Sequence, residues 1–95
     1  MKKGGLEFIA SKVKGAKIEK EPGKFGMEYV TVDGSRQVIF MLGRYDLWVK
    51  KRKPGILFGM VDDVKPWAMG VSADKAEAFL LGWKKDDVMN LNETA

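Results

Sequence analysis

The chain has 95 residues, of which 45% are hydrophobic and 11% aromatic, enough for one domain with a small core. It contains no Cys and no His, which excludes disulfides, thiolate nucleophiles, imidazole bases and zinc sites built from these side chains. The formal net charge of +4 favours anionic partners through long-range attraction.

The N-terminal segment does not read as a secretory signal, because charged residues interrupt the apolar stretch that would follow Met1-Lys2-Lys3. The longest unbroken apolar run extends from Val38 to Leu42, far below the roughly 20 residues that a membrane-spanning helix needs. We therefore expect a single cytoplasmic domain over residues 1–95 with no membrane partner. Its core is expected between about residues 5 and 85, with a tail from 86 to 95.

The first predicted element is a helix over residues 5–14, ended by Gly15 in the position of a left-handed cap. Its apolar residues recur at the i, i+3, i+4 and i+7 spacing of one helical face: Leu6, Ile9, Ala10 and Val13. The alternation of Leu6, Phe8 and Ala10 also fits a strand. Residues 16–20 are predicted as either a short edge strand or a loop.

Two strands are predicted next, at residues 27–32 and 35–42, because both segments are rich in β-branched and aromatic side chains. They flank Asp33-Gly34, a pair that favours a two-residue type I′ turn. A second two-residue turn at Gly43-Arg44, of type II′, would lead into a third strand that begins at Tyr45.

These turns fix a register in which Tyr29 faces Val38 and Phe40 faces Leu47. Because both turns place the same alternate residues on one face, we expect Tyr29, Phe40 and Leu47 to be buried together. The opposite face is of mixed character and carries Glu28, Gln37, Ile39, Met41, Asp46, Trp48 and Lys50.

After a basic loop at residues 50–55, short apolar runs at 56–61 and 64–71 predict two further strands across a turn at Asp62-Asp63. Pro66 cannot donate to a strand ladder, so the second of these strands should lie at an edge of the sheet or be irregular.

The hydrophobic period then changes to that of a helix over residues 72–85, with Ser72 as its N-cap and Asp74 in its first turn. Its apolar face consists of Ala76, Phe79, Leu80 and Trp83. The fold class expected is therefore α+β: an antiparallel four- to five-stranded β-meander packed on one face by this C-terminal helix and by the short N-terminal helix.

Four consecutive cations at residues 50–53 form the main concentration of recognition chemistry, and aromatic rings lie on both sides of them in the sequence. Cations that follow phosphates and flat rings that stack on bases are typical of proteins that bind single-stranded nucleic acid. We therefore expect a small nucleic-acid-binding protein that prefers single-stranded DNA or RNA. The candidate binding residues are Lys50, Lys51, Arg52, Lys53, Trp48, Tyr45, Lys65 and Trp67.

Two other interpretations stay open at this point. In the first, the basic segment is a solvated hairpin tip, and a helix covers Trp48. In the second, the protein is a protein-binding module, such as a small inhibitor or a homo-oligomeric assembly subunit, and its apolar contact consists of Ile39, Met41 and Trp48.

No catalytic, metal or cofactor site is predicted. The acidic pairs Asp62-Asp63 and Asp86-Asp87 lie at a predicted turn and a predicted helix end, where acids are common, and they lack the several oxygen ligands that Mg²⁺ or Ca²⁺ needs. The glycines do not have a phosphate-binding spacing. We therefore expect a binding protein without a cofactor rather than an enzyme.

Overall fold

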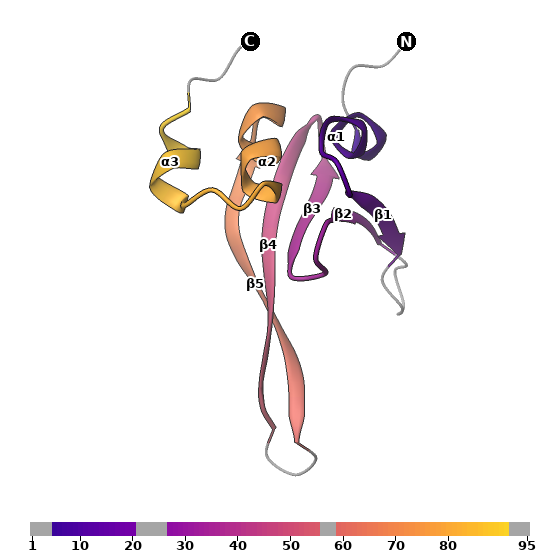
Figure 1. Cartoon of the computed structure of the whole chain (residues 1–95), viewed down its shortest axis with the longest axis vertical. Helices are drawn as coiled ribbons and strands as arrows, with labels where there is room; N and C mark the ends of the chain where they lie inside the picture. The colour runs from indigo at the N-terminus through magenta and orange to yellow at the C-terminus, as the bar shows by residue number, and fades with distance from the viewer. Residues whose placement is uncertain (1–4, 21–26, 56–58, 92–95) are drawn as a thin grey trace.

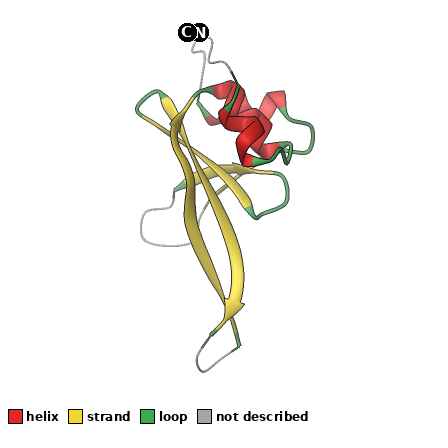
Figure 2. Ribbon diagram, turned by 90° about the vertical axis from the view of Figure 1, so that its left-hand side faces the viewer, coloured by secondary structure: helices red, strands yellow, loops and turns green. Residues whose placement is uncertain are grey.

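The computed structural model describes residues 5–20, 27–55 and 59–91, with side chains at all of these positions except 53, 60 and 61. Within these residues it shows an α+β fold: a five-stranded antiparallel open sheet in the order β1-β2-β3-β4-β5, with the helices on one face (Figure 1, Figure 2). This confirms the expected fold class. The strands are β1 (Lys17–Lys20), β2 (Glu28–Thr31), β3 (Arg36–Met41), β4 (Arg44–Pro54) and β5 (Met60–Val71), and the helices are α1 (Leu6–Lys12), α2 (Ala73–Leu80) and α3 (Lys85–Met89).

The core lies between the sheet and the helices. Val30, Val38 and Leu47 come from three adjacent strands and have no exposed surface. Ile9 of α1 and Phe79 of α2 belong to the same cluster and are equally buried. Helices of 7 and 8 residues are unstable alone in water, so α1 and α2 depend on this packing against the sheet. None of the helices in the described residues is long and apolar enough to cross a membrane.

The connection between β2 and β3 is longer than the two-residue turn expected, and the predicted register is wrong by one residue. Val30 pairs with Val38, where Tyr29 was expected. Because side chains alternate between the two faces of a strand, this shift turns Val30 into the core. Tyr29 is only half-buried, and its hydroxyl donates a hydrogen bond to Glu19 Oε1 at 3.2 Å.

Side-chain hydrogen bonds within the turn explain the longer connection. Thr31 Oγ1 accepts a hydrogen bond from the Gly34 N–H at 2.8 Å. Asp33 Oδ1 accepts from the Arg36 N–H at 3.1 Å and from the Ser35 N–H at 2.9 Å. These bonds satisfy backbone amides without a two-residue turn, as Asx-type turns do. The Arg36 and Ser35 amides also hold the pKa of Asp33 below its ordinary value.

The turn between β3 and β4 is formed by Leu42 and Gly43, one residue earlier than expected. Their φ angles of 51° and 82° are both positive, as a type I′ turn requires. A turn displaced by one residue moves the cross-strand partners by two, so Phe40 keeps its face but opposes Tyr45 near the end of the hairpin. The two ring centroids are 5.1 Å apart, yet Phe40 remains 37% exposed. The prediction that Phe40 is buried is therefore wrong, whereas Leu47 is buried as expected.

Strand β5 is continuous over 12 residues, where the sequence predicted two shorter strands separated by a turn. Asp62 and Asp63 do not form that turn; both lie inside β5 and pair with β4. Residues 56–58 of the first predicted strand lie outside the described part of the chain. The edge position expected from Pro66 is confirmed, because β5 is the last strand of the sheet.

The pairing of β4 with β5 shifts its register twice near Leu47. Such irregularities leave backbone groups outside the regular ladder and increase the twist of the strand pair. Gly70, with φ of 64°, lies at one of them. Its N–H donates to Asp46 Oδ1 at 2.9 Å and its carbonyl accepts from Arg44 Nε at 3.0 Å, so two side chains of β4 replace the missing backbone partners.

The C-terminal segment contains two short helices where one helix and a tail were expected. Helix α2 begins as predicted, because Ser72 Oγ accepts a hydrogen bond from the Lys75 N–H at 3.5 Å. Helix α3 then occupies part of the expected tail, and its Val88 has no exposed surface.

Helix α2 ends five residues before the expected end at residue 85. Gly82 has a φ of 93° and donates its N–H to the Phe79 carbonyl at 3.0 Å, while the Trp83 N–H reaches the Ala78 carbonyl at 3.1 Å. This pair of bonds is a Schellman motif, which stops the helix at a left-handed glycine. Trp83 consequently lies in the connection to α3 and is 42% exposed, so its predicted place in the core is wrong.

The core assignment predicts different costs for two truncations. Leu47→Ala should destabilise the protein by about 2–5 kcal/mol, because Leu47 is fully buried. Phe40→Ala should cost only about 1–2 kcal/mol, because more than a third of Phe40 is already exposed. Equilibrium unfolding in urea measures both values, and a larger loss for Phe40→Ala than for Leu47→Ala would contradict this assignment.

The turn geometry predicts that Leu42→Asn stabilises the fold by about 1 kcal/mol, because Asn tolerates the left-handed conformation and Asn-Gly suits a type I′ turn. Leu42→Ala is the matched control. It removes the same exposed apolar surface but keeps the unfavourable φ, so its stability should stay within about 0.5 kcal/mol of the parent. Equal stabilisation of both variants in thermal unfolding would show that the turn conformation is not the cause.

Candidate nucleic-acid interface

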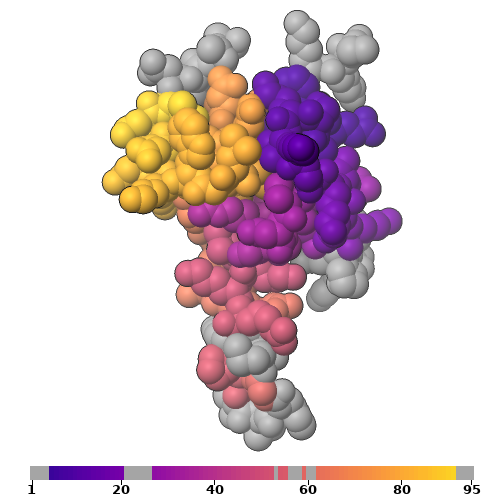
Figure 3. Space-filling model, viewed as in Figure 1, coloured from indigo at the N-terminus to yellow at the C-terminus, as the bar shows by residue number. Residues whose placement is uncertain are grey.

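The basic segment predicted as a loop is instead the second half of β4. Strand β4 has 11 residues, and its first half carries Tyr45 and Leu47 into the core. Its second half runs past the end of β3 and is paired with β5 alone. We call residues 50–54 and 60–65 the ribbon. It projects from the body of the protein and gives the molecule its longest dimension, 48 Å against 29 and 24 Å (Figure 1, Figure 3).

Hydrogen bonds fix both ends of the ribbon. At its base, the Lys50 N–H donates to the Ser35 carbonyl at 2.7 Å, and Ser35 Oγ donates to the Lys50 carbonyl at 3.0 Å. Near its tip, the Gly55 N–H donates to the Gly59 carbonyl. Between these points Lys51 opposes Asp63 and Arg52 opposes Asp62. The basic segment is therefore held in a paired, extended conformation.

The ribbon carries much of the positive charge of the molecule. It contains five cations, Lys50, Lys51, Arg52, Lys53 and Lys65, and two carboxylates, Asp62 and Asp63. Its 11 residues therefore have a net charge of +3, against +4 for the whole chain.

Two ion pairs form in the ribbon: one joins Arg52 of β4 to Asp62 of β5, and the other joins Lys65 to Asp63 within β5. Arg52 Nε lies 3.8 Å from Asp62 Oδ1, and Lys65 Nζ lies 3.5 Å from Asp63 Oδ2. The side chains of Arg52 and Lys65 are 69% and 74% exposed. Exposed pairs of this kind contribute about 0–1 kcal/mol, so a phosphate could replace the carboxylates at little cost.

The cations lie on both faces of the ribbon. Val49 packs against the core, so the side chains that alternate with it mark the opposite face: Trp48, Lys50 and Arg52. Directly paired residues share a face, which adds Asp62 to this set. Lys51, with its partner Asp63, lies on the Val49 side, as does Lys65, which pairs with Val49. The backbone of Lys53 lies opposite Val61 in the same ladder.

The structure separates the three candidate aromatic residues. Trp48 is half-buried beside the base of the ribbon, between Gln37 of β3 and Pro66 of β5. Tyr45 is only 3% exposed, and its hydroxyl donates to the Gly5 carbonyl at 2.9 Å. Burial raises the pKa of the Tyr45 phenol. Tyr45 is thus a core residue, away from any surface that a ligand could reach.

Trp67 lies on the helix side of the sheet. Its ring centroid is 4.7 Å from that of Phe79, and it is flanked by the guanidinium of Arg36 at 5.9 Å and by Lys85 Nζ at 5.4 Å. Arg36 also donates from Nη1 to the Phe79 carbonyl at 2.9 Å and to the Trp83 carbonyl at 3.3 Å, near the end of α2. Through these contacts, Trp67 and Arg36 attach the helices to the sheet.

Asp62 and Asp63 were not predicted from the sequence as part of this candidate interface. They were assigned to a turn, because two adjacent acids between apolar runs are typical of one. The signal that could have placed them is charge complementarity: Asp62 and Asp63 lie opposite Arg52 and Lys51 when the two segments pair as a hairpin. The sequence alone does not give that pairing.

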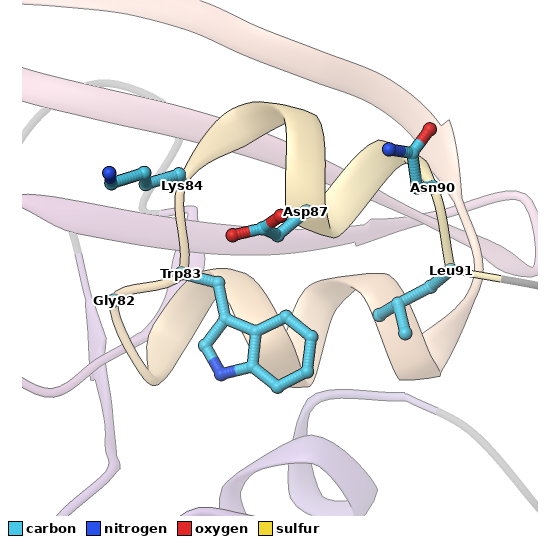
Figure 4. Close-up of a pocket in the computed structure, with 6 residues that line it drawn as sticks. All are labelled: Gly82, Trp83, Lys84, Asp87, Asn90 and Leu91. Atoms are coloured by element: carbon cyan, nitrogen blue, oxygen red, sulfur yellow. The ribbon is translucent and has the colours of Figure 1, made fainter.

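A shallow depression of about 510 Å³ lies beside α3 (Figure 4). It is wide open to solvent. Its lining residues are Gly82, Trp83, Lys84, Asp87, Asn90 and Leu91. No group of three acidic side chains that could hold a metal ion exists in residues 5–20, 27–55 or 59–91.

Comparison of the chain with protein-family models, with curated proteins and with solved structures finds no match in any of the three.

Proposed function

We propose that the protein binds nucleic acid through the ribbon. The observation that carries this proposal is the concentration of five cations on one projecting element with a net charge of +3. Neutralising phosphates releases condensed counterions, and this term dominates the affinity of proteins for nucleic acid. The ribbon projects from the body of the protein, where a long polyanion can approach it (Figure 3).

The anchoring of the ribbon argues against a tip that serves solubility alone. A solvated loop needs no fixed backbone. Here Lys50, at the base of the ribbon, is hydrogen-bonded to Ser35, and β4 is paired with β5 at five successive positions from Lys50 to Pro54. Ordering a segment in this way opposes folding by about 1–2 kcal/mol per residue in backbone entropy. A preorganised basic element suits recognition, because that entropy is not lost again on binding.

A preference for a single strand would need rings that stack on bases, and of the three candidate rings only Trp48 lies on the same face as Lys50 and Arg52. Tyr45 and Trp67 contribute to the core and to helix packing instead. Binding to nucleic acid is therefore proposed from the cations of the ribbon, with Trp48 as a contact beside its base.

A second candidate function, binding to a protein partner, is favoured by the opposite end of β4. The turn residue Leu42 is 99% exposed and Met41 beside it is 48% exposed. With Ile39 and Trp48, Met41 lies on the face of the sheet that the helices leave open. Exposed apolar side chains on a rigid turn are typical protein contacts. Gel filtration of the protein alone and with an oligonucleotide separates the two candidates, because a dimer that ignores the oligonucleotide supports the second.

The proposal predicts how salt affects binding. A site that uses the five cations of the ribbon should give a slope of log affinity against log salt of about −3.5 on a single strand and about −4.5 on a duplex. Replacing Lys51, Arg52 and Lys53 by Ala should flatten the slope by about 2 on the single strand and about 2.7 on the duplex, as measured by fluorescence anisotropy with labelled oligonucleotides.

The matched control replaces Lys12, Lys14 and Lys17 by Ala, which removes the same charge from exposed positions on the body. This variant should retain at least most of the parent slope. The proposal fails if neither oligonucleotide binds at low salt, or if the two triple variants lose the same affinity, since the effect would then come from net charge alone.

A further inference from the structure

We infer that the ribbon enters the major groove of double-stranded DNA with one face toward each wall of the groove. This inference rests on the proposed function and names its ligand. It follows from two observations that the proposed function does not use: the ribbon is two strands wide and one layer thick, and it has cations on both faces.

The dimensions of the ribbon match the major groove. A single β layer with its side chains is about 10 Å thick, the distance at which sheets stack. The major groove of B-form DNA is about 12 Å wide and 8.5 Å deep, whereas the minor groove is about 6 Å wide. From Lys50 to Pro54 the ribbon extends about 13 Å at the usual rise per residue. The ribbon is thin enough for the major groove, too thick for the minor groove, and long enough to reach the base edges.

The distribution of charge distinguishes a groove from a single strand. Among the ribbon's own residues, one face presents Lys50 and Arg52 against a single carboxylate, that of Asp62, and Lys50 also lies near Glu19 of β1. The other face presents Lys51 and Lys65 against the single carboxylate of Asp63. Both faces are thus net positive. A single strand that lies on a sheet uses one face, but a groove has a row of phosphates on each wall and can use both.

The ion pairs of the ribbon fit the same geometry. Arg52 and Lys65 belong to opposite faces, and each is paired with a carboxylate of β5 at 3.8 Å and 3.5 Å. The Arg52–Asp62 pair crosses the ribbon from β4 to β5, whereas the Lys65–Asp63 pair lies within β5. In the groove, these cations would contact phosphates on opposite walls.

The experiment compares the two faces on duplex and single-stranded oligonucleotides of the same sequence. One double variant, Lys50→Ala with Arg52→Ala, alters the first face, and the other, Lys51→Ala with Lys65→Ala, alters the second. On duplex DNA each should weaken binding roughly tenfold or more at 0.1 M salt and flatten the salt slope by about 1.8, because each removes two phosphate contacts. The parent should bind the duplex more tightly than the single strand. Unchanged circular dichroism of both variants shows that the fold is retained.

Groove-specific probes complete the test. A duplex that contains glucosylated 5-hydroxymethylcytosine, whose sugar fills the major groove, should lose binding, whereas netropsin in the minor groove should have no effect. Tighter binding to the single strand, sensitivity to one face alone, or competition by netropsin would overturn the groove assignment and leave the proposed function standing. Absence of binding to both oligonucleotides would overturn both.

Discussion

The hydrogen-bonded pairing of β4 with β5 is the interaction on which the rest of the structure depends. In the sheet, β4 lies between β3 and β5 and brings Leu47 into the core. Beyond Lys50 the same strand has one neighbour, and an isolated two-stranded hairpin is marginally stable in water. The ribbon is therefore stable because it continues strands that are anchored in the core, where Tyr45 and Leu47 of β4 are buried. We would not expect residues 50–65 to form it alone.

The two faces of the sheet differ in what covers them: the helices pack on one face and leave the other open (Figure 2). On the covered side, aromatic and cationic residues attach the helices: the rings of Trp67 and Phe79 are 4.7 Å apart, and Arg36 binds carbonyls at the end of α2. On the open side, Trp48 lies next to the basic ribbon. Aromatic and basic residues thus occur on both sides, and those of the covered side take part in helix packing. This division supports the proposal that the ribbon, rather than the helices, is the recognition element.

Patterns within one element and the antiparallel order of the strands could be predicted from the sequence, but the exact register between strands could not. The helical spacing of Ala76, Phe79 and Leu80 and the cap at Ser72 are local, and the structure has both. The register of β2 against β3 depends on hydrogen bonds from Thr31 and Asp33 to the turn, which strand periodicity does not contain.

The nature of the basic segment was also beyond local reasoning. Charged residues next to Pro54-Gly55 are typical of a loop, and only the long-range pairing with residues 60–65 makes them a strand. We propose that this paired element, and no other surface, contacts nucleic acid. A two-dimensional NMR titration with a short DNA duplex tests this through the amide chemical shifts. We expect changes concentrated at residues 48–53 and 60–65, with the amides of α2 and α3 unaffected. Changes centred on the turn at Leu42 or on α3, with the ribbon unchanged, would contradict it.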